Sequence, residues 1–139
     1  MERRDYLMDQ IHELGMFIAR LIGRLQKSKD GGGGDTARSE AEKAFSVQFG
    51  WDLEELLFME DASFIALMEE NLLVDDHFEA MATVFEMLGD ANPQNQTLLR
   101  KELYYQKARS LLRLVDKRSL NYSMLRRDKL IQLELKMGN

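Results

Sequence analysis

The sequence predicts an all-α protein with about six helices in antiparallel hairpins. Large apolar residues recur at steps of three and four along most of the 139 residues. No stretch alternates apolar and polar residues long enough to form a strand. The chain has one proline, 45% apolar residues and 31% charged residues, which is typical of a folded helical protein. This length fits a single domain, so we expect residues 1–139 to share one core.

The opening segment, Asp5 to Leu25, carries the clearest helical pattern. Its large apolar residues follow steps of four and three and share one face of a helix: Leu7, Ile11, Leu14, Ile18, Leu21 and Leu25. We expect this helix to be packed into the core by several later segments. Beside this seam, Gly15, Ala19 and Gly23 form a row of small residues that predicts the close approach of another backbone. His12 should pack at the edge of the covered face.

A glycine-rich segment follows, at about residues 28–36. Four consecutive glycines have too much conformational freedom for a regular element, so we expect a flexible link. A phosphate-binding loop would follow a strand and continue into Gly-Lys-Ser/Thr, and this segment does neither.

The middle of the chain reads as short helices with recognisable ends. Thr36 to Phe49 forms a helix that Gly50 ends. Asp52, with Glu55 three residues later, matches a capping box at the start of a short helix. Asp61 can start another helix, which carries Phe64, Ile65, Leu67, Met68 and Leu72. Trp51 lies between two elements, where a buried indole filling the hinge is expected.

The last third predicts three more helices. Asp76 and Glu79 repeat the capping arrangement, and Gly89 should end that helix in a left-handed conformation. Pro93 separates it from a helix over Thr97 to Lys117. After a break at residues 119–123, a final helix carries its apolar face on Met124, Leu125, Ile131 and Leu135.

Charge is unevenly distributed along the chain. The net charge is −5 overall, but residues 35–92 carry −13 and residues 93–139 carry +7. The simplest interpretation is that the acidic middle packs beside the basic end, within one molecule or between neighbours. The alternative is a basic surface for an acidic partner, because long-range fields steer association.

Several classes of function find no support in the sequence. There are no cysteines, which excludes disulfides and thiolate zinc sites and fits a cytoplasmic protein. No signal peptide or membrane span is expected at the N-terminus. The acids around His77 have capping roles, and no serine or histidine has the neighbours of a nucleophile. We therefore expect no catalytic residue, no cofactor and no metal site, and no enzymatic activity.

The two ends of the chain resemble a known group of proteins. The segments concerned are RDYLMDQIHELGMFIARLIGRL at the start and LLRKELYYQKARSLLRLVDKRSLNYSMLRRDKLIQLELKMG at the end. They resemble an uncharacterised family of small bacterial all-helical proteins with tetratricopeptide-like helical hairpins. The middle matches loosely, and the glycine run departs from the family's usual link. The resemblance implies a degenerate tetratricopeptide-like array, and no functional residue can be carried over from it.

The function these observations favour is a non-catalytic protein–protein interaction or scaffolding module. The candidate partner surface lies on the last helices, around Tyr105, Arg109 and Tyr122. The alternative is a homodimer that associates through the seam of the N-terminal helix, although a core would use the same residues. A small-molecule or catalytic site in a cleft is a third hypothesis. The basic residues and tyrosines of the last helices could also suit nucleic acid, but the acidity of the chain weighs against nucleic acid as a partner.

Overall fold

The computed structural model describes residues 3–30, 34–92 and 98–138, which form seven α-helices and no strand. In chain order the helices are α1 (Arg3–Asp30), α2 (Gly34–Phe49), α3 (Leu53–Phe58), α4 (Asp61–Asn71), α5 (Asp75–Asp90), α6 (Leu98–Arg118) and α7 (Met124–Lys136). The prediction of an all-α protein is confirmed, with seven helices in place of about six.

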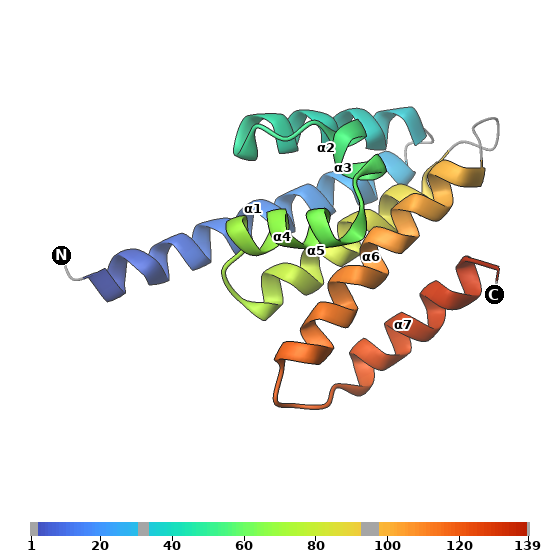
Figure 1. Cartoon of the computed structure of the whole chain (residues 1–139). Helices are drawn as coiled ribbons and strands as arrows, with labels where there is room; N and C mark the ends of the chain where they lie inside the picture. Colours follow the sequence, from blue (N-terminus) through green and yellow to red (C-terminus); the bar gives the residue numbers. More distant parts are fainter. Residues whose placement is uncertain (1–2, 31–33, 93–97, 139) are drawn as a thin grey trace.

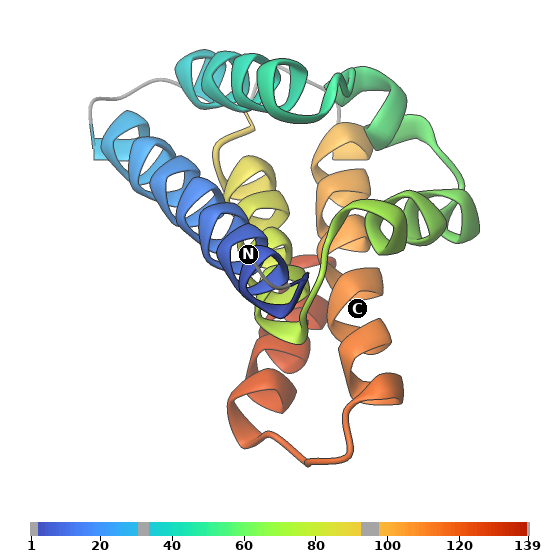
Figure 2. The same ribbon diagram turned by 90° about the vertical axis from the view of Figure 1, so that its left-hand side faces the viewer.

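Helix α5 lies at the centre of the arrangement. It packs most extensively on α6 and also contacts α1 and α2. In Figures 1 and 2, α5 runs between α1 and α6, α2 crosses one end, and α7 lies on the opposite side from α2. The side chains that α5 buries come from every turn: His77, Phe78, Met81, Ala82, Val84, Phe85 and Leu88. The centre of the fold is therefore the α5–α6 pair: α1 and α2 pack on α5, and α3, α4 and α7 pack on α6.

Helix α1 enters the core with only part of its length. Leu14, Ile18, Leu21 and Leu25 are buried against the rest of the chain, whereas Leu7 is 46% exposed. Residues 3–10 are all exposed, and this end of α1 projects past α5 in Figure 1. The predicted burial of the seam is confirmed from Leu14 onward and is wrong for the first turns, because α5 begins too far along α1 to cover them.

The row of small residues in α1 does not receive another backbone, so this prediction is wrong. A Cβ added at Gly15 would lie 3.7 Å from Nε2 of His77, an ordinary contact, and one added at Gly23 would meet open space. His12 is exposed, so its predicted packing role is also wrong. The buried histidine is His77, whose Nδ1 accepts from the Leu73 amide at 3.2 Å and whose Nε2 lies 2.9 Å from the Ile11 carbonyl oxygen.

The segment from α2 to α4 follows the sequence closely. Gly50 ends α2 with φ of +72°, in the left-handed region that favours glycine. Trp51 is buried and stacks on Phe49 with ring centroids 3.9 Å apart. The Asp52 side chain accepts a hydrogen bond from the Glu54 amide at 2.9 Å and so caps α3. The predicted end at Gly50 and the buried Trp51 are confirmed; of the predicted capping box, the cap by Asp52 is confirmed, and no hydrogen bond from the Asp52 amide to Glu55 is present among the described residues.

Both ends of α5 differ from the prediction. Val74 is the N-terminal capping residue and makes no side-chain cap, so the expected role of Asp76 is wrong. At the other end, Gly89 is helical and has no positive φ. A Cβ there would come within 2.5 Å of the Tyr105 ring, so this glycine is needed for packing on α6. Pro93 lies outside the described residues.

The link between the first two helices is shorter than predicted. Helix α1 continues to Asp30 and α2 starts at Gly34, so only residues 31–33 of the expected 28–36 link lie outside the described helices. None of the helices in the described part of the chain is both long and apolar enough to cross a membrane.

Ion pairs join the acidic middle of the chain to its basic end. Five basic residues of α6 and α7 contact acids from the segment of residues 35–92: Arg100 with Glu54, Lys107 with Asp61, Arg118 with Asp75, Arg126 with Glu79, and Lys136 with both Glu86 and Asp90. The prediction that the two segments pack beside one another is thus confirmed within one molecule.

Candidate protein interface on helix α7

Helix α7 is attached to the rest of the fold by one face. The Ser123 hydroxyl accepts a hydrogen bond from the Arg126 amide at 3.1 Å and caps the start of the helix. The side chains that face α5 and α6 follow steps of four, three and four: Arg126, Leu130, Leu133 and Met137. An arginine thus takes the first position of a face that is otherwise apolar.

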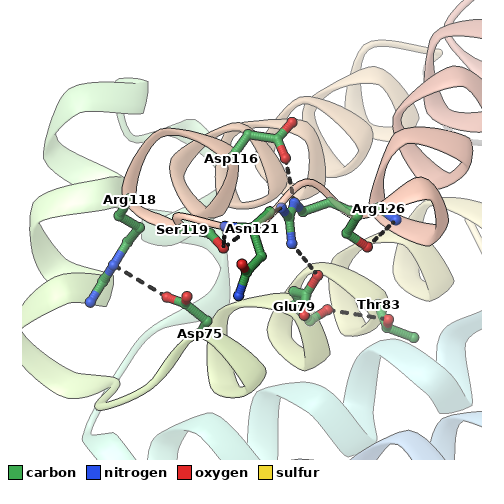
Figure 3. A network of polar contacts seen from close by, with 9 residues as sticks. Asp75, Glu79, Thr83, Asp116, Arg118, Ser119, Asn121 and Arg126 are labelled. Atoms are coloured by element: carbon green, nitrogen blue, oxygen red, sulfur yellow. Dashed lines mark hydrogen bonds and ion pairs between the residues drawn. The ribbon is translucent and has the colours of Figure 1, made fainter.

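Arg126 is held by partners from three segments (Figure 3). Its side chain is 6% exposed. Nε donates to Asp116 of α6, Nη1 donates to Glu79 of α5 at 3.3 Å, and Nη2 donates to the Asn121 carbonyl at 3.1 Å. The hydrogen bond to Asp116 is the main cause of a raised Arg126 pKa, against the lowering effect of burial. The buried charge is therefore paired, as burial of an ion requires.

A second group of charges fixes the other end of α7. Lys136 Nζ donates to Glu86 at 2.7 Å and to Asp90 at 3.0 Å, so α7 is tied to α5 near its last turn. Glu134 accepts from Arg109 at 3.2 Å and from Arg113 at 3.3 Å. These contacts determine which face of α7 turns toward the core.

The opposite face of α7 is apolar and exposed. We define the α7 outer face as Met124, Leu125, Ile131 and Leu135 of α7 together with Leu120 and Tyr122 of the segment that precedes the helix; their exposed fractions run from 47% at Ile131 to 102% at Leu120. The sequence predicts that the last helix carries Met124, Leu125, Ile131 and Leu135 as its apolar residues, without indicating which face is buried. The structure places all four on the exposed side, and the buried side carries Arg126, Leu130, Leu133 and Met137.

The spacing on the α7 outer face is that of a helix–helix seam. Met124, Asp128, Ile131 and Leu135 follow steps of four, three and four, the pattern of residues that meet a partner helix. Asp128 is exposed and has no ion-pair partner among the residues that the structure describes. The seam therefore has three apolar positions and one acidic one.

The residues predicted as a partner surface do not lie on one face. Tyr105 is 2% exposed, and its hydroxyl donates to Asp90 at 2.7 Å. Burial, together with this hydrogen bond, raises the pKa of the Tyr105 hydroxyl. Arg109 is partly buried in its contact with Glu134. Only Tyr122, at 76% exposed, belongs to the α7 outer face, so Tyr105 is unavailable to a partner.

Sequence reasoning missed Arg126 because both faces of α7 carry apolar residues at helical spacing. Residues 126, 130, 133 and 137 are spaced like residues 124, 128, 131 and 135. Each stripe has three apolar positions and one charged position, Arg126 in the first and Asp128 in the second, so the pattern does not show which stripe is buried. The two stripes differ in whether their charged residue has a partner: Arg126 is reached by acids from other segments of the chain. Only the tertiary structure shows which acids those are.

No family model, curated protein or solved structure matches this chain. Within the described ranges, no three histidine, aspartate or glutamate side chains are grouped closely enough to hold a metal ion.

Proposed function

We propose that the protein is a non-catalytic protein–protein interaction module that presents the α7 outer face to a helix of another protein. The observation that carries this proposal is that α7 has a second apolar stripe, opposite the face that anchors it. Single exposed apolar residues are ordinary on protein surfaces, but a contiguous group of large ones is typical of an interaction site.

The acidic position in the seam favours another protein over a second copy of this chain. In a parallel pair of α7 helices, Asp128 would face its own counterpart. In an antiparallel pair that matches Met124 with Leu135, Asp128 would face Ile131. The first arrangement opposes like charges, and the second buries an unpaired carboxylate. A partner helix with lysine or arginine opposite Asp128 avoids both costs.

For the finer architecture, we propose a degenerate tetratricopeptide-like array, as in the bacterial family that the chain ends resemble. The supporting observations are the extensive packing of α5 on α6 and the burial of Tyr105, Lys107 and Ala108 in the Tyr105-Gln-Lys-Ala108 segment of α6. Arrays of this kind bind partner segments on exposed helix faces. A cytoplasmic location is also part of the proposal, on the basis of a chain without cysteine.

The test compares proteins captured from the native host by the full chain and by two variants. Ile131→Asp places a charge in the α7 outer face, and Gln132→Glu is the matched control beside it. We expect at least one protein to be captured by the original chain and the control but lost with Ile131→Asp. A photoreactive residue in place of Leu125 should then cross-link to a helix that has a basic residue in its apolar stripe.

Circular dichroism should show the same helical content in all three proteins, which separates loss of an interface from loss of fold. Capture that is identical for the original chain and Ile131→Asp would contradict the proposal, whatever proteins are recovered.

A second candidate function is self-association through the projecting start of α1. Four of the six seam residues lie in the core, so the full seam is not available. Tyr6, Leu7 and Met8 are still exposed, on a stretch of helix that has little packing to stabilise it. Light scattering tests this: a dimer that Leu7→Glu converts to a folded monomer would support it, and a monomeric original chain would exclude it.

A further inference from the structure

A second surface lies between α1 and α2, which Figures 1 and 2 show side by side at the start of the chain. The two helices enclose a hollow of about 470 Å³. The side chains around it are Phe17, Arg20 and Arg24 from α1 and Glu40, Lys43 and Val47 from α2. We call this hollow the α1–α2 groove. It shares no residue with the α7 outer face.

The groove is lined by basic side chains that take no part in the ion pairs of the described residues. Arg20, Arg24 and Lys43 form no ion pair with any residue in the described ranges. Lys27 lines an adjoining hollow, which shares Arg24 and Glu40 with the groove. Among the described side chains that line either hollow, Glu40 is the only acid.

The basic residues of this groove differ from those that face α3, α4 and α5 in having no ion-pair partner in the described part of the chain. The basic residues of α6 and α7 that face α3, α4 and α5 pair with acids there, as at Arg126 and Lys136. Between α1 and α2, Arg20, Arg24 and Lys43 line one hollow although the chain as a whole carries −5. Like charges gathered at one site raise the free energy of the unbound protein, and an anionic ligand would lower it.

The floor of the groove is apolar. Phe17 packs edge-on against Phe49 with ring centroids 5.6 Å apart, and Ala44 is buried beside it. Val47 is 81% exposed at the rim. A ligand that fills this groove therefore gains from apolar contacts as well as from charge.

We propose that the α1–α2 groove binds an acidic peptide segment of a partner protein, with carboxylates on Arg20, Arg24 and Lys43 and an apolar side chain on Phe17 and Val47. Carboxylates match arginine in geometry as well as in charge. A nucleic acid would also meet the cations, but the net charge of −5 on the chain and Glu40 in the groove lining disfavour a long polyanion.

The test uses a fluorescently labelled synthetic peptide of glutamates with a leucine at every fourth position. We expect saturable binding to the full-length protein that weakens as salt is added. The double variant Arg24→Glu with Lys43→Glu should weaken binding by about tenfold or more, equivalent to about 1.4 kcal/mol or more. Arg127→Glu reverses one exposed charge on α7 and should change binding by less than about twofold.

Two further probes distinguish the ligand classes. A peptide with glutamine in place of glutamate should not bind, and one with serine in place of leucine should bind more weakly. Binding of the acidic peptide that survives the double variant would overturn the proposal, as would its failure to bind the original chain. A mixed-sequence single-stranded oligonucleotide that binds more tightly than the peptide would also overturn it and assign the groove to nucleic acid.

Discussion

Helices α1 and α7 are both amphipathic and both lie at the edge of the fold, but they are placed by different forces. In α1 the seam predicted from spacing is the seam that enters the core, from Leu14 to Leu25. In α7 the apolar residues named from the sequence, Met124, Leu125, Ile131 and Leu135, face solvent, and a stripe that begins with Arg126 is buried. The first helix is oriented by its apolar residues, and the last by its ion pairs.

The difference between α1 and α7 shows under which condition an apolar stripe predicts the buried face of a helix. Burial of one leucine or isoleucine side chain is worth about 1.5–3 kcal/mol. The two stripes of α7 have similar numbers of such residues, so burial of either gives a similar gain. The contacts of Arg126 with Asp116 and Glu79 can be made in only one orientation, and they decide between the two. In α1 no second stripe competes.

The largest difference in unfolding free energy should come from replacing, in separate variants, one leucine on each face of α7 by alanine. Leu133 is fully buried and Leu135 is 64% exposed. Leu133→Ala should lower the free energy of unfolding by about 3 kcal/mol, because it leaves a cavity. Leu135→Ala should change it by less than about 0.5 kcal/mol. Chemical denaturation of both variants measures the difference, and equal effects would break the proposed orientation of α7.

A somewhat smaller loss is expected from removing the charge that orients α7. Arg126→Ala should cost about 2 kcal/mol, below the value for fully buried pairs because Asp116 and Glu79 keep some contact with water. Arg127→Ala, at the exposed neighbouring position, should stay within about 0.5 kcal/mol. Urea titrations of the two variants make the comparison. If Arg126→Ala leaves the free energy of unfolding unchanged, apolar contacts alone orient the helix.

In α1 one substitution should stabilise the protein. Gly23 is exposed, helical and has open space where a Cβ would lie. Gly23→Ala should therefore raise the free energy of unfolding by about 0.5–1 kcal/mol, because alanine loses less backbone freedom in a helix. Gly89→Ala is the contrasting variant, since its Cβ would overlap the Tyr105 ring, and it should destabilise. Thermal unfolding distinguishes the two, and destabilisation by Gly23→Ala would indicate a close neighbour at this position.

The smallest loss of stability is expected from replacing Lys136, and this loss depends on pH. Burial lowers the pKa of Lys136, but its hydrogen bonds to Glu86 and Asp90 outweigh this, so the pKa is raised above the usual 10.5. The contribution of this contact to stability is then fully present below pH 10.5 and lost as the pH rises through the folded value. Lys136→Gln should cost about 0.5 kcal/mol at neutral pH.

Denaturation at neutral pH and again above the raised pKa of Lys136 checks this, because the difference in unfolding free energy between the original chain and Lys136→Gln should close only above that pKa. A gap that persists unchanged would show that the lysine acts through its alkyl chain and not through its charge.

Features set by neighbours in sequence could be predicted, and those set by distant partners could not. Gly50 and Asp52 end and start helices through their own backbone conformation and nearest amides. Asp76 matched the same capping pattern, but α5 starts at Asp75, after an uncapped Val74, and the glutamate of that pattern, Glu79, contacts Arg126 instead. Of the candidate site, Tyr122 could be found as an exposed residue, while Tyr105 could not be recognised as buried without the position of Gly89.

The sequence by itself determined the all-α class and the approximate extent of the helices, whereas it indicated the pairing of the acidic middle with the basic end only as the simplest of several interpretations. Periodicity, capping and composition act over a few residues, so a linear chain displays them. The tertiary structure alone decided that the α5–α6 pair is central, that the first turns of α1 project, and that Met124, Ile131 and Leu135 of α7 face outward. Each outcome depends on contacts between residues far apart in the chain, such as His77 with Ile11 and Arg126 with Glu79, and sequence spacing does not contain that information.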